Sequence, residues 1–299
     1  MKIAIRTFGS PPPVDREIAA NGARWRVPEE TPVALIYNGR NHAVMLATPA
    51  DLDDFAVGFT LTERIVGALS DIETIDIHQE ERGVDIRLTL SAPAIERFDA
   101  RQQRRNLVGR AGCGVCGVEN AETFFERLAP VRASKAAIAE AALLRAAKSL
   151  PDHQPLNART HTVHAAAFAD LHGDILLARE DVGRHNALDK LLGAMALRAS
   201  ALDSPHPEEP ARLVLRDALR APQDEAGGRL EGWRALRGGD GFVVMSSRCS
   251  YEIVEKAARA GVAAILSVSA PTAFALAKAE EANIVLYALS EAGAVAIGR

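Results

Sequence analysis

From about residue 160 onward, short apolar runs alternate with amphipathic segments, and this alternation constrains the fold more than any other feature of the sequence. Strands alternating with helices predict a sheet that contains parallel strands and is covered by helices. The sequence therefore predicts an α/β fold for this part of the chain. The predicted strands cover residues 164–168, 175–178, 242–245, 263–268 and 284–288, and the predicted helices cover residues 184–197, 250–260 and 272–282.

The first half of the chain has a different pattern, with two hairpins around a helix. Residues 33–48 predict a β-hairpin because two apolar runs flank Asn38-Gly39, and both of these residues tolerate the positive φ of a tight turn. Residues 51–66 predict a helix with one apolar face and an acidic first turn. A second hairpin is predicted around the polar turn at residues 78–83.

These patterns divide the chain into three parts. We expect a flexible arm over residues 1–27, an α+β region over residues 28–150 and an α/β region over residues 151–299. The polar, basic and glycine-rich residues 97–117 predict an exposed loop, which helices near residues 119–128 and 134–150 follow. Residues 199–241 interrupt the α/β alternation and predict a surface insertion.

Composition argues against several classes of function. The 299 residues include 35 Lys and Arg against 39 Asp and Glu, a formal charge of −4 that argues against a strongly basic nucleic-acid-binding protein. The N-terminus lacks the apolar core of a signal peptide. The longest apolar stretch, residues 263–277, is interrupted by polar residues and is too short to cross a bilayer. We expect a cytoplasmic protein with neither a membrane nor a nucleic-acid partner.

Three cysteines are too few for a disulfide scaffold, but two of them are close together as Cys113-Gly-Val-Cys116. A thiolate is both a nucleophile and a metal ligand, and neighbouring positive charge lowers the pKa of a thiol. The pair therefore predicts a reactive site. Four arginines precede it: Arg101, Arg104, Arg105 and Arg110.

The residues alone leave four interpretations of this pair open. The thiols could be incidental, or they could carry sulfur or redox chemistry on a loop. A structural zinc site needs about four ligands, and the nearest histidines, His161 and His164, are far downstream with a short spacer. The signature of a zinc deaminase is H-x-E followed by P-C-x-x-C. Here His78 and Glu80 form an H-x-E upstream of the two cysteines, but the residue before Cys113 is not proline. The third cysteine, Cys249, is expected to be a packing residue.

Three polar segments follow predicted strands and precede predicted helices. The carboxyl ends of parallel strands share one edge of a sheet, and helix N-termini there present free N–H groups to an anion. Arginine can add bidentate contacts to phosphate, so these segments predict an anion-binding edge, the alternative being three independent helix caps. The candidate residues are Asp181, Gly183, Arg184, His185, Asn186, Ser246, Arg248, Ser269 and Thr272.

Together, these motifs resemble those of the FdhD family, the formate dehydrogenase accessory sulfurtransferases. The resemblance implies a layered mixed sheet with helices like that of cytidine deaminases, plus a smaller hairpin-rich α+β part. The matching segments are residues 49–66, GCGVCG at 112–117, His164-Ala-Ala-Ala, EDVGRHNA at 180–187, residues 246–261 and SAPT at 269–272.

The resemblance also implies a sulfur relay. A cysteine desulfurase would load a persulfide on Cys113, with Cys116 as its partner. The sulfur would then pass to the bis(molybdopterin guanine dinucleotide) molybdenum cofactor that formate dehydrogenase needs. A guanine nucleotide such as GDP is expected to occupy the same site, and a homodimer is expected. A zinc-dependent deaminase-like enzyme and a non-catalytic cofactor carrier remain the alternatives.

Two departures from the family pattern stand out. The family's cofactor-binding C-terminal segment contains no Arg or Lys here, and its glutamate would repel phosphate. In addition, His161 stands where a glycine is expected. The segment consists of Leu289, Ser290, Glu291, Ala292, Gly293 and Ala294.

Overall fold

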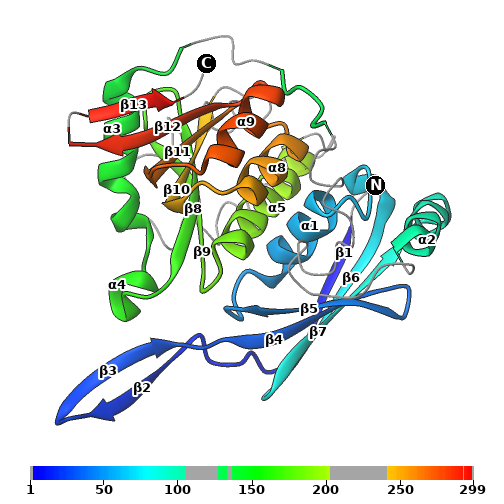
Figure 1. Cartoon of the computed structure of the whole chain (residues 1–299). Coiled ribbons are helices and arrows are strands. Elements are labelled where there is room, and N and C mark those ends of the chain that lie inside the picture. The colour runs from blue at the N-terminus through cyan, green and yellow to red at the C-terminus, as the bar shows by residue number, and fades with distance from the viewer. Residues whose placement is uncertain (1–2, 106–126, 133–136, 203–240, 292, 298–299) are drawn as a thin grey trace.

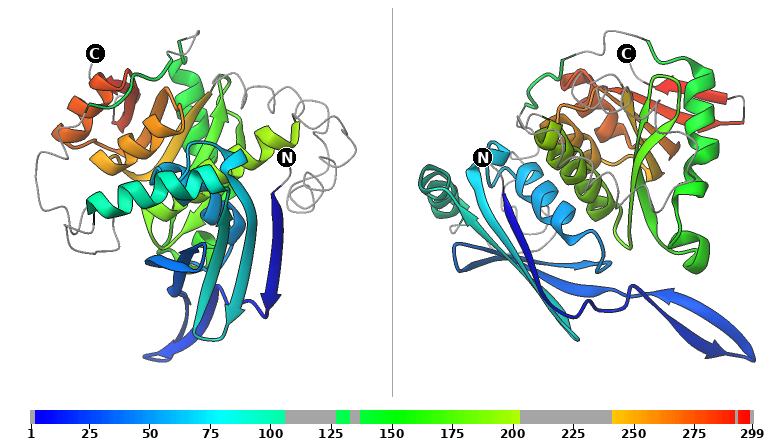
Figure 2. Two further views of the ribbon diagram at one scale, coloured as in Figure 1. Left: turned by 90° about the vertical axis from the view of Figure 1, so that its right-hand side faces the viewer. Right: turned by 180° about the vertical axis from the view of Figure 1, so that it is seen from behind.

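The computed structural model describes residues 3–105, 127–132, 137–202, 241–291 and 293–297 (Figure 1). These residues form two large sheets with helices packed between them and a further helix on the far side of the second sheet (Figure 2). The α/β character expected from the sequence is confirmed. Among the described residues, every helix is too short or too polar to cross a membrane.

The N-terminal sheet has the strand order β1-β6-β7-β4-β5. Both predicted hairpins are confirmed, and Asn38 and Gly39 turn the first of them with φ values of 46° and 79°. Helix α1 (Leu52–Thr62) packs on one face of the sheet. The strands are β1 (Ala4–Gly9), β4 (Thr31–Tyr37), β5 (Arg40–Ala47), β6 (Ile72–Glu80) and β7 (Gly83–Leu90).

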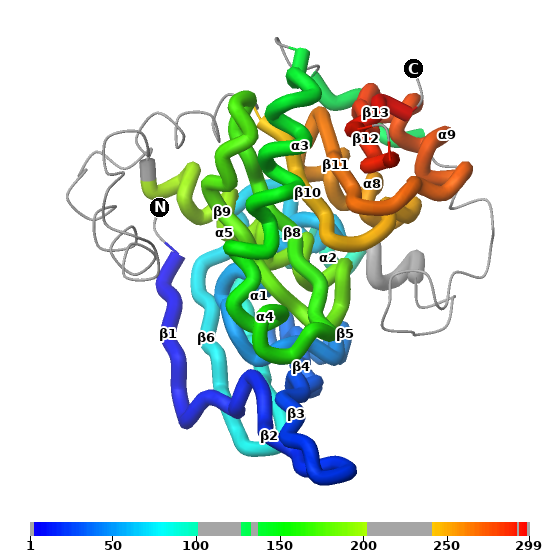
Figure 3. Tube along the Cα trace, turned by 90° about the vertical axis from the view of Figure 1, so that its left-hand side faces the viewer, coloured from blue at the N-terminus to red at the C-terminus, as the bar shows by residue number. Residues whose placement is uncertain are grey.

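Three strands occupy the region where a flexible arm was expected. Strand β1 pairs in parallel with β6, a partner almost 70 residues away, so local sequence pattern could not reveal it. Strands β2 (Asp15–Ala20) and β3 (Ala23–Pro28) form a ribbon that extends from the sheet (Figure 3). Asn21-Gly22 turns this ribbon with positive φ at both residues. The same turn signal was present at Asn38-Gly39, but here mixed charged and apolar residues flank it instead of two apolar runs.

Part of the expected loop at residues 97–117 is helical. Helix α2 (Ala92–Arg105) continues through residues 97–105. Ala94 and Phe98, one turn apart, are buried against the N-terminal sheet, so tertiary packing favours a helix over the loop that polar composition predicted. Residues 106–117 lie outside the described residues, and so do residues 203–240 of the insertion predicted at residues 199–241. Residues 199–202 of that prediction are helical instead. The predicted helix at residues 134–150 begins at Glu140, as α3 (Glu140–Ser149).

The C-terminal sheet has the order β13-β12-β11-β10-β8-β9. Strands β10, β11 and β12 are parallel, whereas β8, β9 and β13 pair in antiparallel fashion, so the sheet is mixed. The last strand, β13, was not predicted. The strands are β8 (His164–Asp170), β9 (Ile175–Asp181), β10 (Gly241–Arg248), β11 (Ala264–Ser269), β12 (Val285–Ser290) and β13 (Gly293–Ile297).

Helices cover both faces of the C-terminal sheet. One face packs against α5 (Arg184–Leu202), α8 (Tyr251–Arg259) and α9 (Ala273–Glu281). The other face packs against α3. Helices α1 and α5 meet where the two halves join, and a Cβ added at Gly58 would lie 1.7 Å from the Asp189 carbonyl oxygen. Only glycine permits this close contact between the backbones of the two helices. The contact holds the N-terminal half of the molecule against the C-terminal half.

Candidate functional site

Four strand ends meet at one edge of the C-terminal sheet. Strands β10, β11 and β12 are parallel, and β9 runs in the same direction because β8 is antiparallel to both β9 and β10. Helices α5, α8 and α9 begin directly after three of these ends. The predicted juxtaposition of the three polar segments is therefore confirmed. We call residues 180–186, 246–250 and 269–272 the rim.

Three helix N-termini contribute N–H groups to the rim. The first-turn N–H groups of a helix have no partner within it and carry the positive end of its dipole. At α9, the Thr272 hydroxyl accepts one of them, from Ala275, at 3.2 Å. An edge with three such N-termini suits a ligand with several negative charges, such as a diphosphate.

Positive side chains also gather on the rim. Arg184 is partly exposed and Arg248 is exposed, and neither has a carboxylate partner among the residues that the structure describes. The Nε atom of Arg184 is buried without a hydrogen-bond partner there. Burial lowers the pKa of His164 at the start of β8, and the neighbouring Arg184 lowers it further. The rim therefore has unneutralised positive charge.

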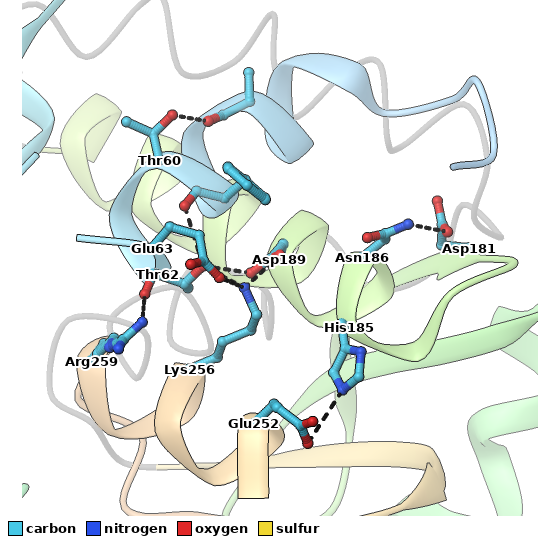
Figure 4. Close-up of polar contacts among 12 residues, drawn as sticks. Thr60, Thr62, Glu63, Asp181, His185, Asn186, Asp189, Glu252, Lys256 and Arg259 are labelled. Carbon is cyan, nitrogen blue, oxygen red and sulfur yellow. Dashed lines mark hydrogen bonds and ion pairs between the residues drawn. The ribbon is translucent and has the colours of Figure 1, made fainter. Parts of the chain in front are cut away.

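Among the described residues, His185 is the basic rim residue that lies beside an acid. Its Nε2 lies 3.8 Å from Oε2 of Glu252 on α8 (Figure 4). The distance allows charge attraction but is too long for a good hydrogen bond. The imidazole beside Glu252 lowers the pKa of that carboxyl to about 2. Glu252 is thus ionised at neutral pH and helps to orient His185.

Two predicted ligand residues are buried instead of facing the rim. Asp181 is fully buried, and its Oδ1 accepts from Gly183 N at 2.8 Å and from Asn186 Nδ2 at 3.0 Å. Its Oδ2 accepts from Thr48 N at 2.9 Å and lies 2.7 Å from Lys190 Nζ. Because both carboxylate oxygens are occupied, Asp181 and Asn186 shape the turn that carries Arg184 and cannot bind a ligand directly without rearrangement.

The sequence did not identify Thr48 and Lys190 as part of this site. Thr48 lies in a different half of the chain, so no local pattern connects it to the turn. Lys190 had a weak signal, since it and Asp189 are charged residues directly before the apolar run of α5. A lysine within the buried face of a helix is rarely tolerated without a partner.

The rim hydroxyls have mixed roles. The Oγ of Ser246 accepts from Ala165 N at 2.8 Å and so ties β10 to the start of β8. Ser269 is exposed and pairs in the sheet with Arg248. Thr272 is exposed while it caps α9. Ser269 and Thr272 are thus available at the rim surface, whereas Ser246 is engaged.

The C-terminal segment forms the hairpin between β12 and β13, next to the rim edge. Leu289 pairs with Ala294, and both pack against the core on the α3 side of the sheet. The Ser290 hydroxyl donates to the Gly293 carbonyl at 3.0 Å, and Glu291 is exposed. Ala292 lies outside the described residues. The segment can offer a ligand backbone groups and a hydroxyl, but no positive charge.

The three cysteines cannot be compared directly, because Cys113 and Cys116 lie outside the described residues. Cys249 is fully buried, and burial raises the pKa of its thiol to about 12. Such a thiol is almost entirely protonated at neutral pH and is a poor nucleophile. The passive role expected for Cys249 therefore agrees with its surroundings.

The chain on either side of the Cys113–Cys116 segment is attached to different halves of the molecule. Before it, α2 packs on the N-terminal sheet. After it, Leu128 N donates to Glu281 Oε1 at 2.5 Å, and Val131 N donates to the Ala282 carbonyl at 2.8 Å. The segment therefore links the N-terminal sheet to the C-terminal end of α9.

His78, the candidate for a deaminase-like site, lies on β6 and stacks against Phe8 with ring centroids 4.8 Å apart.

Comparison with known proteins finds similarity over nearly the whole chain. The sequence matches the FdhD/NarQ family over residues 28–205 and 228–297. A protein from Cupriavidus necator described as sulfur carrier protein FdhD is 40% identical over 293 residues, which cover 95% of this chain and 88% of the relative. A protein of the same description from Chromobacterium violaceum is 41% identical, with coverages of 87% and 83%.

Solved structures are similar as well. The crystal structure of a protein from Desulfotalea psychrophila, described as a formate dehydrogenase accessory protein, gives a TM-score of 0.60 over 95% of both chains. The sequences are only 21% identical, so this comparison shows a shared fold.

Proposed function

This chain belongs to the FdhD/NarQ family, and we propose that it is a sulfur carrier that supplies sulfur for the activation of formate dehydrogenase. Two curated relatives described as sulfur carrier protein FdhD match most of the chain at about 40% identity. The donor we propose is a cysteine desulfurase in the cytoplasm, and the protein would act as a homodimer. The acceptor is the bis(molybdopterin guanine dinucleotide) molybdenum cofactor, which arrives as substrate.

Cys113 carries the sulfur in this proposal. Its thiolate attacks the terminal sulfur of the desulfurase persulfide, so a new S–S bond forms on Cys113 and the donor cysteine leaves as a thiolate. Cys116 assists as the second thiol of the pair. In the transfer step, the Cys116 thiolate attacks the inner sulfur of Cys113, the S–S bond of the persulfide breaks, and the terminal sulfur leaves as hydrosulfide for the bound cofactor. The Cys113–Cys116 disulfide formed in this way is reduced again by a cellular dithiol. Cys249 takes no part, because its buried thiol stays protonated.

The rim holds the substrate. The guanine dinucleotide portions of the cofactor carry diphosphates, and the edge that combines three helix N-termini with Arg184 and Arg248 supplies the complementary charge. This combination is the observation that carries the binding half of the proposal. Ser269, Thr272 and the hairpin at residues 289–294 border the same edge and add hydroxyl and backbone groups.

Mass spectrometry tests the sulfur-carrying half. The purified protein is incubated with a cysteine desulfurase and cysteine, alkylated and digested. We expect one added sulfur on the peptide that contains Cys113, and none at that position in Cys113→Ala. Cys249→Ala is the matched control and should load as the wild type does. An absence of added sulfur on Cys113, with the desulfurase active on a known acceptor, would rule out the relay.

A further inference from the structure

Two lysines are buried where the two halves of the molecule meet, and only one of them contacts the rim. Lys190 on α5 is fully buried. Its Nζ lies 2.7 Å from Asp181 Oδ2, donates to the Thr48 carbonyl at 2.9 Å and lies 3.4 Å from the Glu180 carbonyl. All three ammonium donors have acceptors, which is the condition for keeping such a charge out of water.

Thr48 uses each of its polar groups to hold the same turn. Its N–H donates to Asp181 Oδ2, its carbonyl accepts from Lys190, and its hydroxyl accepts from Val182 N at 3.1 Å. The residue is fully buried at the end of the first hairpin. The Asn186 side chain adds a second link to this hairpin, because it donates to the Leu46 carbonyl at 2.8 Å.

These contacts fix the backbone on both sides of Arg184. The Val182 and Gly183 amides and the Asn186 side chain all have partners inside the protein. The backbone that carries Arg184 and His185 therefore has little freedom to move. A ligand that meets such a preorganised turn does not have to order it on binding.

We propose that Lys190 and Thr48 are positioning residues, which hold the Asp181–Asn186 turn so that Arg184, His185 and the start of α5 face a diphosphate at the rim. The inference rests on the proposed function, because the diphosphate is that of the guanine nucleotide. It goes further in assigning to the N-terminal half a part in binding: Thr48 comes from the hairpin and never touches the ligand.

Lys256 provides a matched comparison within the same molecule. It is also buried, and its Nζ lies 2.8 Å from Glu63 Oε1, 2.9 Å from Asp189 Oδ2 and 3.0 Å from Thr62 Oγ1 (Figure 4). These partners join α8 to α1 and α5. None of them belongs to the rim, so loss of Lys256 should weaken the junction without releasing the turn.

The test uses the full-length protein with GDP as the probe. GDP affinity is measured by calorimetry, and hydrogen exchange is followed on the peptide that covers residues 181–188. Lys190→Met should weaken GDP binding about tenfold or more and speed exchange in that peptide, since a charge-assisted contact of this kind contributes about 1.5–3 kcal/mol, where 1.4 kcal/mol is tenfold. Lys256→Met should leave GDP affinity close to that of the wild type, and it should speed exchange in that peptide no more than elsewhere in the protein.

A gentler pair of variants keeps the test valid if Lys190→Met does not fold. Thr48→Val removes the hydroxyl and nearly keeps the volume, whereas Thr48→Ser keeps the hydroxyl. We expect Thr48→Val to speed exchange at the Val182 amide and to weaken GDP binding about fivefold, with Thr48→Ser close to wild type, since one net hydrogen bond contributes about 0.5–1.5 kcal/mol.

The proposal is overturned if Thr48→Val equals Thr48→Ser in both measurements, or if Lys256→Met disturbs the turn as much as Lys190→Met does. Failure of the proposed function gives a different result. If the wild type binds no GDP, the rim is not a nucleotide site, and the exchange of residues 181–188 still decides whether Lys190 and Thr48 hold the turn.

Discussion

Arginines on the N-terminal sheet and arginines on the rim of the C-terminal sheet have opposite surroundings. On the N-terminal sheet, Arg6 lies 2.6 Å from Asp76, and Arg87 lies 3.0 Å from Asp85. On the rim of the C-terminal sheet, Arg184 and Arg248 have no carboxylate partner among the described residues. Exposed ion pairs contribute little to stability, but they neutralise charge.

The difference separates a solvated surface from a binding surface. Clustered positive charges without partners repel one another, and the dipoles of three helix N-termini add to that repulsion. A folded protein gains no stability from this arrangement. It is useful when an anion arrives, because the anion is attracted to every group at once. The comparison therefore favours the rim, and not the charged face of the N-terminal sheet, as the surface that would bind an anion.

The largest effect is expected where a paired charge is also buried. Lys256→Met should lower the free energy of unfolding by about 3–5 kcal/mol, because it leaves the Asp189 carboxylate buried without a counter-charge. The carboxylates of Asp189 and Glu63 outweigh the effect of burial and raise the pKa of Lys256, so the lysine is charged in the native protein. Urea denaturation at neutral pH measures the loss.

Arg6→Ala is the matched control on the exposed surface. Its ion pair with Asp76 is open to solvent, so its removal should change the unfolding midpoint little. Equal losses in Lys256→Met and Arg6→Ala would contradict the view that burial, and not pairing alone, determines the energetic weight of these charges.

The next effect concerns the rim arginines themselves. Arg184→Ala and Arg248→Ala should each weaken GDP binding about tenfold, and the double variant about a hundredfold, since a charge-assisted contact to phosphate contributes about 1.5–3 kcal/mol. Stability should change little, because neither side chain has a carboxylate partner among the residues that the structure describes. Calorimetry with GDP measures the affinity. Arg6→Ala combined with Arg87→Ala serves as the control, and an equal loss there would show that only overall charge matters.

A smaller effect tests Glu252, the acid beside His185. The pKa of Glu252 is about 2 in the folded protein against an ordinary value of 4.5, so its contribution to stability is present above pH 4.5 and is lost as the pH falls toward 2. Because the side chain is partly exposed, we expect the loss to be about 1–2 kcal/mol. Glu252→Gln should remove this part of the acid sensitivity. Denaturation curves between pH 5 and pH 3 measure it, and identical slopes for both proteins would contradict the assignment.

The smallest effect separates stability from binding. His161 ends the short helix α4 (Asn157–Thr160) with φ 55°, in the left-handed region that favours glycine. His161→Gly should therefore stabilise the protein by about 0.5–1 kcal/mol and leave GDP affinity unchanged. His172→Gly, at an exposed position without positive φ, should not stabilise it. Thermal unfolding of both variants is the measurement, and a gain in His172→Gly alone would contradict the backbone argument.

The sequence predicted those parts of the fold and site that depend on local pattern. Asn38-Gly39 located the first hairpin because turn geometry is a property of two residues. The rim was predictable as well, since parallel strands place polar segments such as residues 180–186, 246–248 and 269–272 at one edge. The glycine expected at position 161 agrees with the backbone conformation found there.

The features that could not be predicted from the sequence depend on contacts between residues that are far apart in the chain. Strand β1 is formed by pairing with β6, and the residues around β1 do not by themselves indicate this partner. Asp181 had the sequence signal of a ligand-binding residue, yet Thr48 and Lys190 occupy its oxygens inside the protein. Local pattern predicts that a polar residue is important, but only the packed structure shows whether it faces the ligand or supports the residue that does.

Formate dehydrogenase activity in cells tests the central claim most directly. A strain that lacks its own copy of this gene would carry the wild type, Cys113→Ala or the double variant Arg184→Ala with Arg248→Ala, each produced at a matched level. The account predicts activity with the wild type, none with Cys113→Ala and a strong reduction with the double arginine variant. Full activity with Cys113→Ala would contradict it, because the protein would then serve formate dehydrogenase without carrying sulfur on that thiol.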